Sequence, residues 1–364
     1  MASPTLLGNS SALGILLEYP VHDEKVLRKP VVELDEKVRS YTGSTPVVGF
    51  IGAGNYASRT LIPAFKKAGA ALDTLVTSGG ISGVHHGNKN QFVTASTETK
   101  DLWNNDKINT VAIVTRHDAH AQQVLDALKS GKNVFVEKPL ALTLDELDMI
   151  DKAYHDANKS NTIRLMVGFN RRYAPHTVKM KELLNSHKSP KSIIMTVNAG
   201  AIPTEHWVQN SLIGGGRIIG EASHFIDLMR HLIGHKIKGF TATMMGNTPG
   251  IEVREDKTSI TLSFEDGSFG TIHYLANGGS TFPKERIEVF CDDAVLQMDN
   301  YRVLTGYGWA GFKKMKLFKQ NKGQKACAKA FIESIVHGKE SPISYEEIIE
   351  SSRISIEVAN SLRN

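Results

Sequence analysis

The chain has 364 residues, a mass of 39.9 kDa and a formal net charge of +5 at pH 7. Hydrophobic residues make up 41% of the sequence and charged residues 22%, so the apolar content is ample for a core and excludes disorder over most of the chain. The two cysteines, Cys291 and Cys327, are too few for a disulfide scaffold and favour a reducing compartment, so we expect a cytoplasmic protein.

No run approaches the ~20 apolar residues that a membrane helix needs, so we expect no membrane partner. A charge of +5 over this length is weak evidence for nucleic acid, which we do not expect as a partner. It is better evidence for a small anionic ligand. At ~150 residues per domain, the length predicts about two domains.

Residues 1–44 are predicted to form an extension or linker rather than a domain. Residues 13–20 are apolar enough for one strand, and a charged, poorly periodic stretch follows them.

Residues 45–170 show apolar strands that alternate with helices, which is typical of parallel βαβ units. The expected strands are 47–51, 72–77, 92–95, 109–115, 133–137 and 164–169. The expected helices are 56–68, 119–128 and 144–157.

Residues 171–364 are richer in strands, with helices around them. The expected strands are 192–199, 237–245, 258–264, 269–276, 287–290 and 295–298, and Asp266-Gly267 favours a hairpin turn. The expected helices are 175–184, 219–232, 325–336 and 345–362. The pattern predicts an α+β domain with an open, mainly antiparallel sheet, and we expect the C-terminal helices to pack back on the first domain.

A glycine-rich turn follows the first strand of the βαβ series. Gly52 permits a tight turn, Gly54 lets a pyrophosphate approach the backbone, and the small Ala57 lets helix and strand pack closely. The phosphate would lie at the positive end of the helix, beside Asn55 and Tyr56. In this context the turn predicts dinucleotide binding by a Rossmann domain, and the chain as a whole is classed as α/β.

The choice of cofactor is open between NAD and NADP. The second strand ends at Thr77 without the acid that commonly binds the ribose of NAD, and no arginine stands there for a 2′-phosphate. Because no group of basic residues is present there to bind the 2′-phosphate of NADP, we lean slightly to NAD. We interpret His85 and His86 as a solvated loop and expect no metal site.

Four segments carry a resemblance to a known family: residues 131–141, with Glu137-Lys138-Pro139 at their centre, and residues 115–120, 168–175 and 214–227. Together they resemble the Gfo/Idh/MocA family (glucose–fructose oxidoreductase, inositol dehydrogenase, rhizopine catabolism). The resemblance runs from about residue 47 to the C-terminus. It implies a two-domain NAD(P)-dependent oxidoreductase that acts on sugars or polyols.

Further segments, at 198–200, 205–207, 271–274 and 282–286, resemble the C-terminal half of bi-domain oxidoreductases whose first half is similar to zinc alcohol dehydrogenases. This closer resemblance implies nucleotide-sugar or polysaccharide chemistry. It leaves two readings open: the chain is a fragment of such an enzyme, or a separate zinc-dehydrogenase-like subunit is its partner.

Hydride transfer from an alcohol needs a base for the hydroxyl proton and a donor that steadies the developing alkoxide. Lys138 follows a strand at the carboxyl edge of the sheet, where ligands bind, so we expect it to bind the reacting hydroxyl. His224, Glu221 and Asp227 share one face of a predicted helix. The resemblance implies His224 as general base and Glu221, where the family typically has Asp, as its polar partner.

Other candidates surround these catalytic residues. Arg171 and Arg172 suit an anionic substrate group such as a diphosphate, with a pair of solvated surface arginines as the alternative. The remaining expected substrate contacts are His206 and Trp207. The remaining expected cofactor contacts are Thr77, Thr115, Arg116, His117, His120, Glu137 and Lys138.

The leading hypothesis is an NAD(P)-dependent sugar or nucleotide-sugar dehydrogenase. One alternative is a redox-neutral, NAD-dependent glycosidase of the same fold. A second is a non-catalytic, cofactor-binding partner of a separate dehydrogenase subunit. The resemblance also implies a homo-oligomer, a dimer or tetramer, built on the second domain's sheet.

Overall fold

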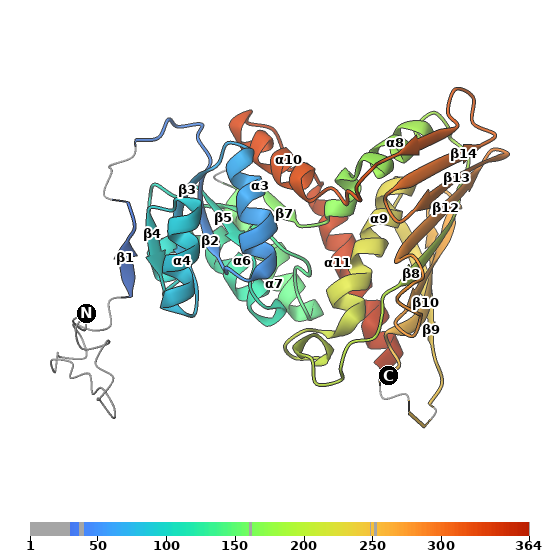
Figure 1. Ribbon diagram of the computed structural model, residues 1–364, viewed down its shortest axis with the longest axis horizontal. Helices are drawn as coiled ribbons and strands as arrows, with labels where there is room; N and C mark the ends of the chain where they lie inside the picture. The colour runs from blue at the N-terminus through green and yellow to red at the C-terminus, as the bar shows by residue number, and fades with distance from the viewer. Residues whose placement is uncertain (1–29, 36–39, 160–161, 248, 251–252, 364) are drawn as a thin grey trace, which may run out of the picture.

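The computed structural model describes residues 30–35, 40–159, 162–247, 249–250 and 253–363. The strand expected at 13–20 lies outside these residues. Two β-sheets, each packed against helices, organise the described chain (Figure 1). Among its helices, none is long and apolar enough to cross a bilayer.

The first sheet has the strand order β1-β4-β3-β2-β5-β6-β7, and all of its pairs are parallel except β1 with β4. The central strand β2 is buried along its whole length, as expected for a parallel strand covered on both faces. This confirms the predicted Rossmann-type domain. Its strands are β1 (Val31–Glu33), β2 (Val47–Ile51), β3 (Ala71–Val76), β4 (Thr94–Ser96), β5 (Thr110–Ile113), β6 (Asn133–Val136) and β7 (Leu165–Val167).

The helices of this domain include two that the sequence did not predict, α4 and α5, and His85 and His86 lie on α4 rather than in a loop. Helix α4 is rich in glycine because it packs closely: a Cβ at Gly83 would lie 2.7 Å from Thr77 Oγ1, and one at Gly87 would lie 2.3 Å from Leu34. The helices are η1 (Ala57–Leu61), α3 (Ile62–Lys67), α4 (Gly80–Asn90), α5 (Lys100–Trp103), η2 (His117–Ala119), α6 (His120–Lys129) and α7 (Leu144–Asn158).

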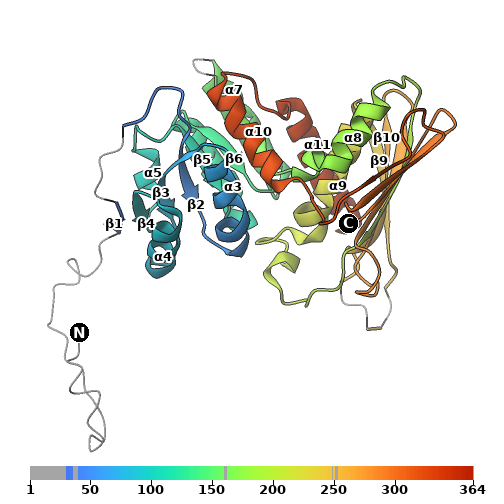
Figure 2. The same cartoon turned by 45° about the horizontal axis from the view of Figure 1, so that its top comes forward.

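The second sheet has the order β15-β14-β13-β12-β8-β11-β10-β9, and only β8 and β11 are parallel. This confirms the open, mainly antiparallel sheet, although β14 and β15 were not predicted. Figures 1 and 2 show α8 and α9 on the face turned toward the first domain. The strands are β8 (Ser192–Asn198), β9 (Ile237–Met244), β10 (Lys257–Phe264), β11 (Phe269–Leu275), β12 (Glu285–Cys291), β13 (Ala294–Asp299), β14 (Val303–Tyr307) and β15 (Lys314–Lys316).

The C-terminal helices contact both parts of the molecule. Helix α10 packs on α3, and α11 packs on α7 as well as on α9. Phe331 of α10 completes an aromatic cluster with Phe65 and Phe135, at centroid distances of 6.3 and 5.6 Å. The remaining helices are η3 (Asn170–Tyr173), α8 (Pro175–Leu184), η4 (Trp207–Gln209), η5 (Ile218–Ala222), α9 (Ser223–Ile233), α10 (Gln324–Val336) and α11 (Tyr345–Arg363).

Candidate active site

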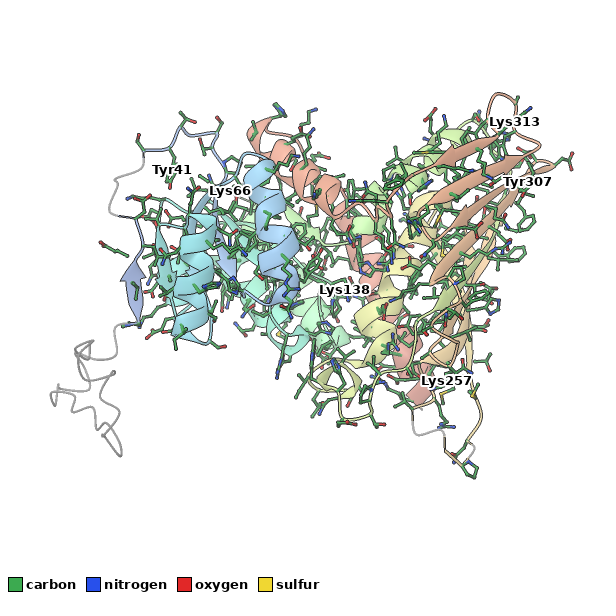
Figure 3. All side chains as sticks on the ribbon, in the orientation of Figure 1. Tyr41, Lys66, Lys138, Lys257, Tyr307 and Lys313 are labelled. Carbon is green, nitrogen blue, oxygen red and sulfur yellow. The ribbon has the colours of Figure 1, made fainter. Side chains whose placement is uncertain are left out.

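A cavity of about 670 Å³ lies where the carboxyl ends of β2, β5 and β6 face η3, η4 and α9. Such a crevice at the carboxyl ends of parallel strands is where open α/β sheets bind ligands. Lys138 lies between the two sheets (Figure 3). The cavity is lined by Gly54, Asn55, Tyr56, Ala57, Val114, Thr115, His117, His120, Glu137, Lys138, Asn170, Arg171, Trp207, His224, Lys322 and Gln324.

The glycine-rich turn has the geometry that a dinucleotide requires. Gly52 has φ +102°, and a Cβ there would lie 2.4 Å from the Val114 carbonyl oxygen. Gly54 faces open space, since a Cβ on it would meet nothing within 4 Å. The turn leads into η1, a π-helical turn that begins at the buried Ala57. An exposed backbone cradle at a helix start, facing a cavity, fits a pyrophosphate.

Three expected cofactor contacts, Gly52, Thr77 and Arg116, are not among the residues that line this cavity. The Thr77 hydroxyl instead donates to the Gly79 carbonyl at 2.8 Å. Arg116 lies over the Trp207 ring, 5.7 Å from its centroid. Gly52 acts through the tight turn rather than by direct contact.

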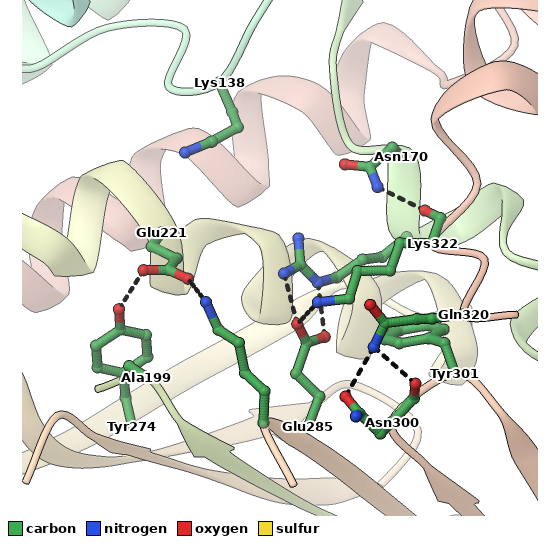
Figure 4. Close-up of polar contacts among 12 residues, drawn as sticks. Lys138, Asn170, Ala199, Glu221, Tyr274, Glu285, Asn300, Tyr301, Gln320 and Lys322 are labelled. Carbon is green, nitrogen blue, oxygen red and sulfur yellow. Dashed lines mark hydrogen bonds and ion pairs between the residues drawn. The ribbon is translucent and has the colours of Figure 1, made fainter. Parts of the chain in front are cut away.

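Lys138 enters the cavity from a cis Lys138–Pro139 peptide at the end of β6. Its ammonium donates a hydrogen bond to the Gly220 carbonyl of η5, across the two domains. Figure 4 shows it above Glu221, pointing toward the helix that carries that residue. Burial lowers the pKa of Lys138, and Glu221 and Glu137 act against that shift.

Glu137 lies beside Lys138 and close against the backbone of Gly168, where a Cβ would meet a carboxylate oxygen at 2.7 Å. Burial raises the pKa of Glu137 to about 7, although Lys138 and a hydrogen bond with Tyr56 act to lower it. Burial and Glu137 also hold the pKa of Tyr56 well above its ordinary value.

His224 lies on α9 with 6% of its surface exposed, and its Nδ1 has no hydrogen-bond partner among the described residues. Burial, together with Arg171 and Lys138, holds the pKa of His224 well below 6.5. The imidazole is therefore neutral at pH 7. A neutral imidazole in a cavity that also holds an ammonium can accept a proton from a bound hydroxyl.

Glu221 is held by three donors rather than presented to the cavity. Its carboxylate accepts bonds from Tyr274 (2.6 Å), Lys284 (2.8 Å) and Arg217 (2.8 Å), as Figure 4 shows in part. Burial acts to raise its pKa, but Lys284 and the other donors hold the pKa of Glu221 far below its ordinary value. Glu221 stays ionised, and its charge acts on Lys138 rather than transferring a proton.

Arg171 and Arg172 are both buried, so the alternative of solvated surface arginines is wrong. Arg171 lines the cavity but forms a double hydrogen bond with Glu285, at 2.9 and 3.0 Å. Arg172 does not reach the cavity lining; it pairs with Asp227 at 2.6 Å and with Glu347. Both guanidinium groups already pair with buried carboxylates, although Arg171 shares Glu285 with Lys322 at 2.6 Å, so this geometry gives no support to an anion held by Arg172.

Two predicted histidines line the cavity and join its walls. His117 Nδ1 lies 2.8 Å from the Gly214 carbonyl oxygen, and burial lowers the pKa of His117 to about 3. His120 Nδ1 lies 2.6 Å from the Pro139 carbonyl oxygen. His120 thus contacts the backbone of the residue that follows Lys138, and His117 contacts the segment that precedes η5.

The aromatic and hydroxyl candidates divide between the cavity and its surroundings. Trp207 lines the cavity and packs edge-on against His117 at 4.8 Å. His206 is exposed and outside the lining, where its Nδ1 accepts a bond from the Val208 amide. Thr115 also lines the cavity, with its hydroxyl donating to Gln123 at 2.9 Å.

Sequence reasoning missed four lining residues, Val114, Asn170, Lys322 and Gln324. Asn170 lies in a segment that carried the family resemblance, and its amide donates to the Lys322 carbonyl at 2.5 Å. For Lys322 and Gln324, the one clue in the sequence was the glycine between them, Gly323. A Cβ at Gly323 would lie 2.3 Å from the Asn170 carbonyl oxygen, so only glycine fits there. That close approach holds Lys322 and Gln324 at the cavity.

Two family models match the chain. "Oxidoreductase family, NAD-binding Rossmann fold" (GFO_IDH_MocA) matches residues 47–169, and "GFO/IDH/MocA C-terminal domain" matches residues 179–297. These matches confirm the resemblance on which the sequence analysis relied. They give no support to the narrower resemblance to bi-domain enzymes, which stays a prediction.

Individual proteins are similar to the chain over large parts of its length. The scyllo-inositol 2-dehydrogenase (NAD(+)) of Bacillus subtilis (strain 168) is 27% identical over 71% of this chain and 76% of its own length. Oxidoreductase P35 of Formosa agariphila is 33% identical over 51% of this chain and 60% of its own length. In three curated relatives the matched region spans 60–62% of the relative's length.

Solved structures share the fold. Levoglucosan dehydrogenase in complex with NADH and levoglucosan superposes with a TM-score of 0.75 at 20% identity, over 87% of this chain and 98% of that one.

Proposed function

The chain belongs to the Gfo/Idh/MocA family of oxidoreductases, and we propose that it transfers a hydride between a nicotinamide cofactor and a hydroxyl-bearing carbon of a sugar, polyol or nucleotide sugar. The observation that carries the proposal is the meeting of Lys138 and the neutral His224 in one cavity, beside the glycine-rich turn. The names of the relatives support it, since they include inositol dehydrogenases and a levoglucosan dehydrogenase.

In this proposal each residue has one task. Gly54, Asn55, Tyr56 and Ala57 hold the dinucleotide. Both NAD and NADP fit the family, and the slight lean to NAD is unchanged. When bound, its nicotinamide accepts or supplies the hydride. The Lys138 ammonium donates to the substrate hydroxyl and steadies the developing negative charge on its oxygen.

His224 takes the hydroxyl proton as the carbon is oxidised and returns it in the reverse direction. The negative charge of Glu221 opposes the lowering of the Lys138 pKa by burial and so favours the ammonium form. Because burial excludes water from both groups, their interactions with the substrate are stronger than they would be in solution.

No observation favours the redox-neutral glycosidase or the non-catalytic partner subunit. Both predict no net change in the cofactor, so one experiment separates them from the proposal. The purified chain is mixed with NAD⁺ or NADP⁺ and a panel of polyols, free sugars, uronic acids and nucleotide sugars, and absorbance at 340 nm is followed. We expect reduced cofactor with one substrate class; a flat trace with every substrate would overturn the proposal.

The pH dependence of kcat/KM follows from the state of His224 in the chain without substrate. Protonation removes the base, and the pKa of His224 lies below 6.5, so activity is lost only as the pH falls through that lower range. We expect the acid limb of the profile below pH 6.5. Glu137→Gln is measured in parallel, because it removes a group with a pKa of about 7 from the same cavity. An acid limb above pH 6.5 in both proteins would contradict the role of His224.

The second sheet carries apolar residues on its uncovered face, and we expect a homo-oligomer. Ser192 of β8 pairs with both Phe269 and Phe290, which places these rings on one face of the sheet. Ile194, Phe269 and Phe290 are 39%, 53% and 41% exposed, and apolar side chains grouped on one sheet face are a feature of protein–protein contact surfaces. Light scattering at micromolar concentration is expected to give the mass of a dimer or tetramer, and Phe290→Asp is expected to lower it. A monomer mass for the unmodified chain would refute this prediction.

A further inference from the structure

One segment of the chain is strongly cationic. Residues 300–332 contain seven lysines, one arginine and no acidic residue. The rest of the chain holds 35 cationic and 38 acidic residues, a net charge of −3, so the positive charge of the protein is concentrated in this segment. Charge gathered in one place, rather than spread, is what attracts an anionic ligand.

Part of this segment forms a second cavity, of about 760 Å³, which we call the lysine groove. It lies between α3, α10 and the turn that joins β15 to α10, and Gln324 lines both it and the active-site cavity. The two spaces therefore adjoin. The groove is lined by Thr60, Ala64, Lys67, Ala68, Leu317, Phe318, Lys319, Gln320, Asn321, Gln324, Lys325, Ala326 and Lys329.

The charge in the lysine groove is largely uncompensated. No carboxylate lines it. Among the described residues no acid pairs with Lys67, Lys319 or Lys325, and Lys329 has only Glu333, at 3.4 Å. This differs from Arg171 and Arg172, each of which pairs with a buried carboxylate. Free ammonium groups bind phosphate as point charges.

The groove also offers an aromatic surface. Phe318 is 90% exposed, although a large ring is normally buried in a folded chain. It stands between Leu317 and Lys319, so a flat apolar ring lies next to the ammonium groups. A ligand with a planar base linked to phosphate groups would match both features.

We propose that the lysine groove binds the nucleoside diphosphate part of a nucleotide-sugar substrate while its sugar lies in the active-site cavity. The inference rests on the proposed function and narrows it to one substrate class. The lysines pair with the diphosphate, and Phe318 stacks on the base. The volume of the groove is within the range of ~300–1,000 Å³ that small-molecule sites occupy.

The test is calorimetric titration of the chain, saturated with NADH so that the dinucleotide site is filled. The probes are UDP, GDP, inorganic pyrophosphate and glucuronic acid. We expect UDP or GDP to bind at one site per chain, more tightly than pyrophosphate, with an affinity that falls as salt is raised. Binding of glucuronic acid instead of both nucleotides would overturn the proposal in favour of a carboxylate ligand.

Substitutions assign the binding to the groove. Lys325→Glu is expected to weaken the nucleoside diphosphate about tenfold or more, because a charge-assisted contact is replaced by repulsion. Phe318→Ala is expected to weaken the nucleoside diphosphate but not pyrophosphate. The matched control is Lys107→Glu, the same charge change at an exposed lysine outside the groove lining, which is expected to bind as the unmodified chain does.

Failure of this inference can be told apart from failure of the proposed function. If neither nucleotide binds, or Lys325→Glu binds them as tightly as the unmodified chain, the lysine groove is not the site, whatever the 340 nm assay gives. If the nucleotide binds in the groove but no substrate reduces the cofactor, the inference about binding stands and the dehydrogenase proposal falls.

Discussion

Replacing Lys138 with alanine is expected to lower kcat by about 10²–10⁴-fold, the range usual for loss of a positioned proton donor or oxyanion partner. The side chain reaches from the end of β6 to the Gly220 carbonyl of η5, so its ammonium stands where the two domains meet. Its interaction grows as the hydroxyl oxygen gains negative charge. The loss is therefore expected in kcat more than in KM, and the 340 nm assay with the preferred substrate measures both.

Two companion variants sharpen this result. Lys138→Arg keeps the positive charge but spreads it over a larger, planar guanidinium group. This variant is expected to have only part of the activity of the unmodified chain. Lys107→Ala removes an exposed lysine and is expected to leave kcat unchanged. A kcat for Lys138→Ala near that of the unmodified chain would contradict the proposed mechanism.

Replacing Arg172 with alanine is expected to lower the free energy of unfolding by about 3–5 kcal/mol, because it leaves a buried carboxylate without its partner. Asp227 is fully buried and accepts bonds from Arg172 at 2.6 to 3.0 Å. Burial acts to lower the pKa of Arg172, but Asp227 and Glu347 raise it, so the guanidinium stays charged at every pH at which the protein folds. The effect is measured as a lower urea midpoint by circular dichroism.

The chain offers a matched control for this prediction. Arg353 forms a bond of similar length with Asp148, at 2.7 Å, but the two side chains are 36% and 62% exposed. Arg353→Ala is expected to change stability by about 0–1 kcal/mol, as is usual for a surface ion pair. Equal shifts for the two variants would show that the buried pair contributes no more than the exposed one.

Patterns local in sequence predicted most of the fold. The apolar runs of the first domain are visible in the sequence because its parallel strands are buried on both faces. The alternation of apolar and polar residues in β8 and β10–β13 is visible because these strands are buried on one face. Helix α4 was not predicted, since Gly80, Gly83 and Gly87 weaken a helical signal. Its glycines make sense only once Thr77 and Leu34 are seen against it.

The sequence predicted individual residues of the candidate site but not the contacts between them. Lys138 and His224 stood out because motifs carried them. The partners of Glu221 did not, because Tyr274 and Lys284 follow it by 53 and 63 residues and nothing local links them. The same holds for Arg172, whose partner Glu347 lies 175 residues away.

The aromatic cluster that Phe331 completes has a consequence for the order in which the chain is made. Phe331 emerges from the ribosome 196 residues after Phe135, which at about 5–20 residues per second is roughly 10–40 s later. Within that interval the last strand of the first sheet, β7, is also synthesised, but α10 is not yet in place to cover Phe65 and Phe135. The nascent protein thus presents an apolar face to chaperones until its last two helices are synthesised.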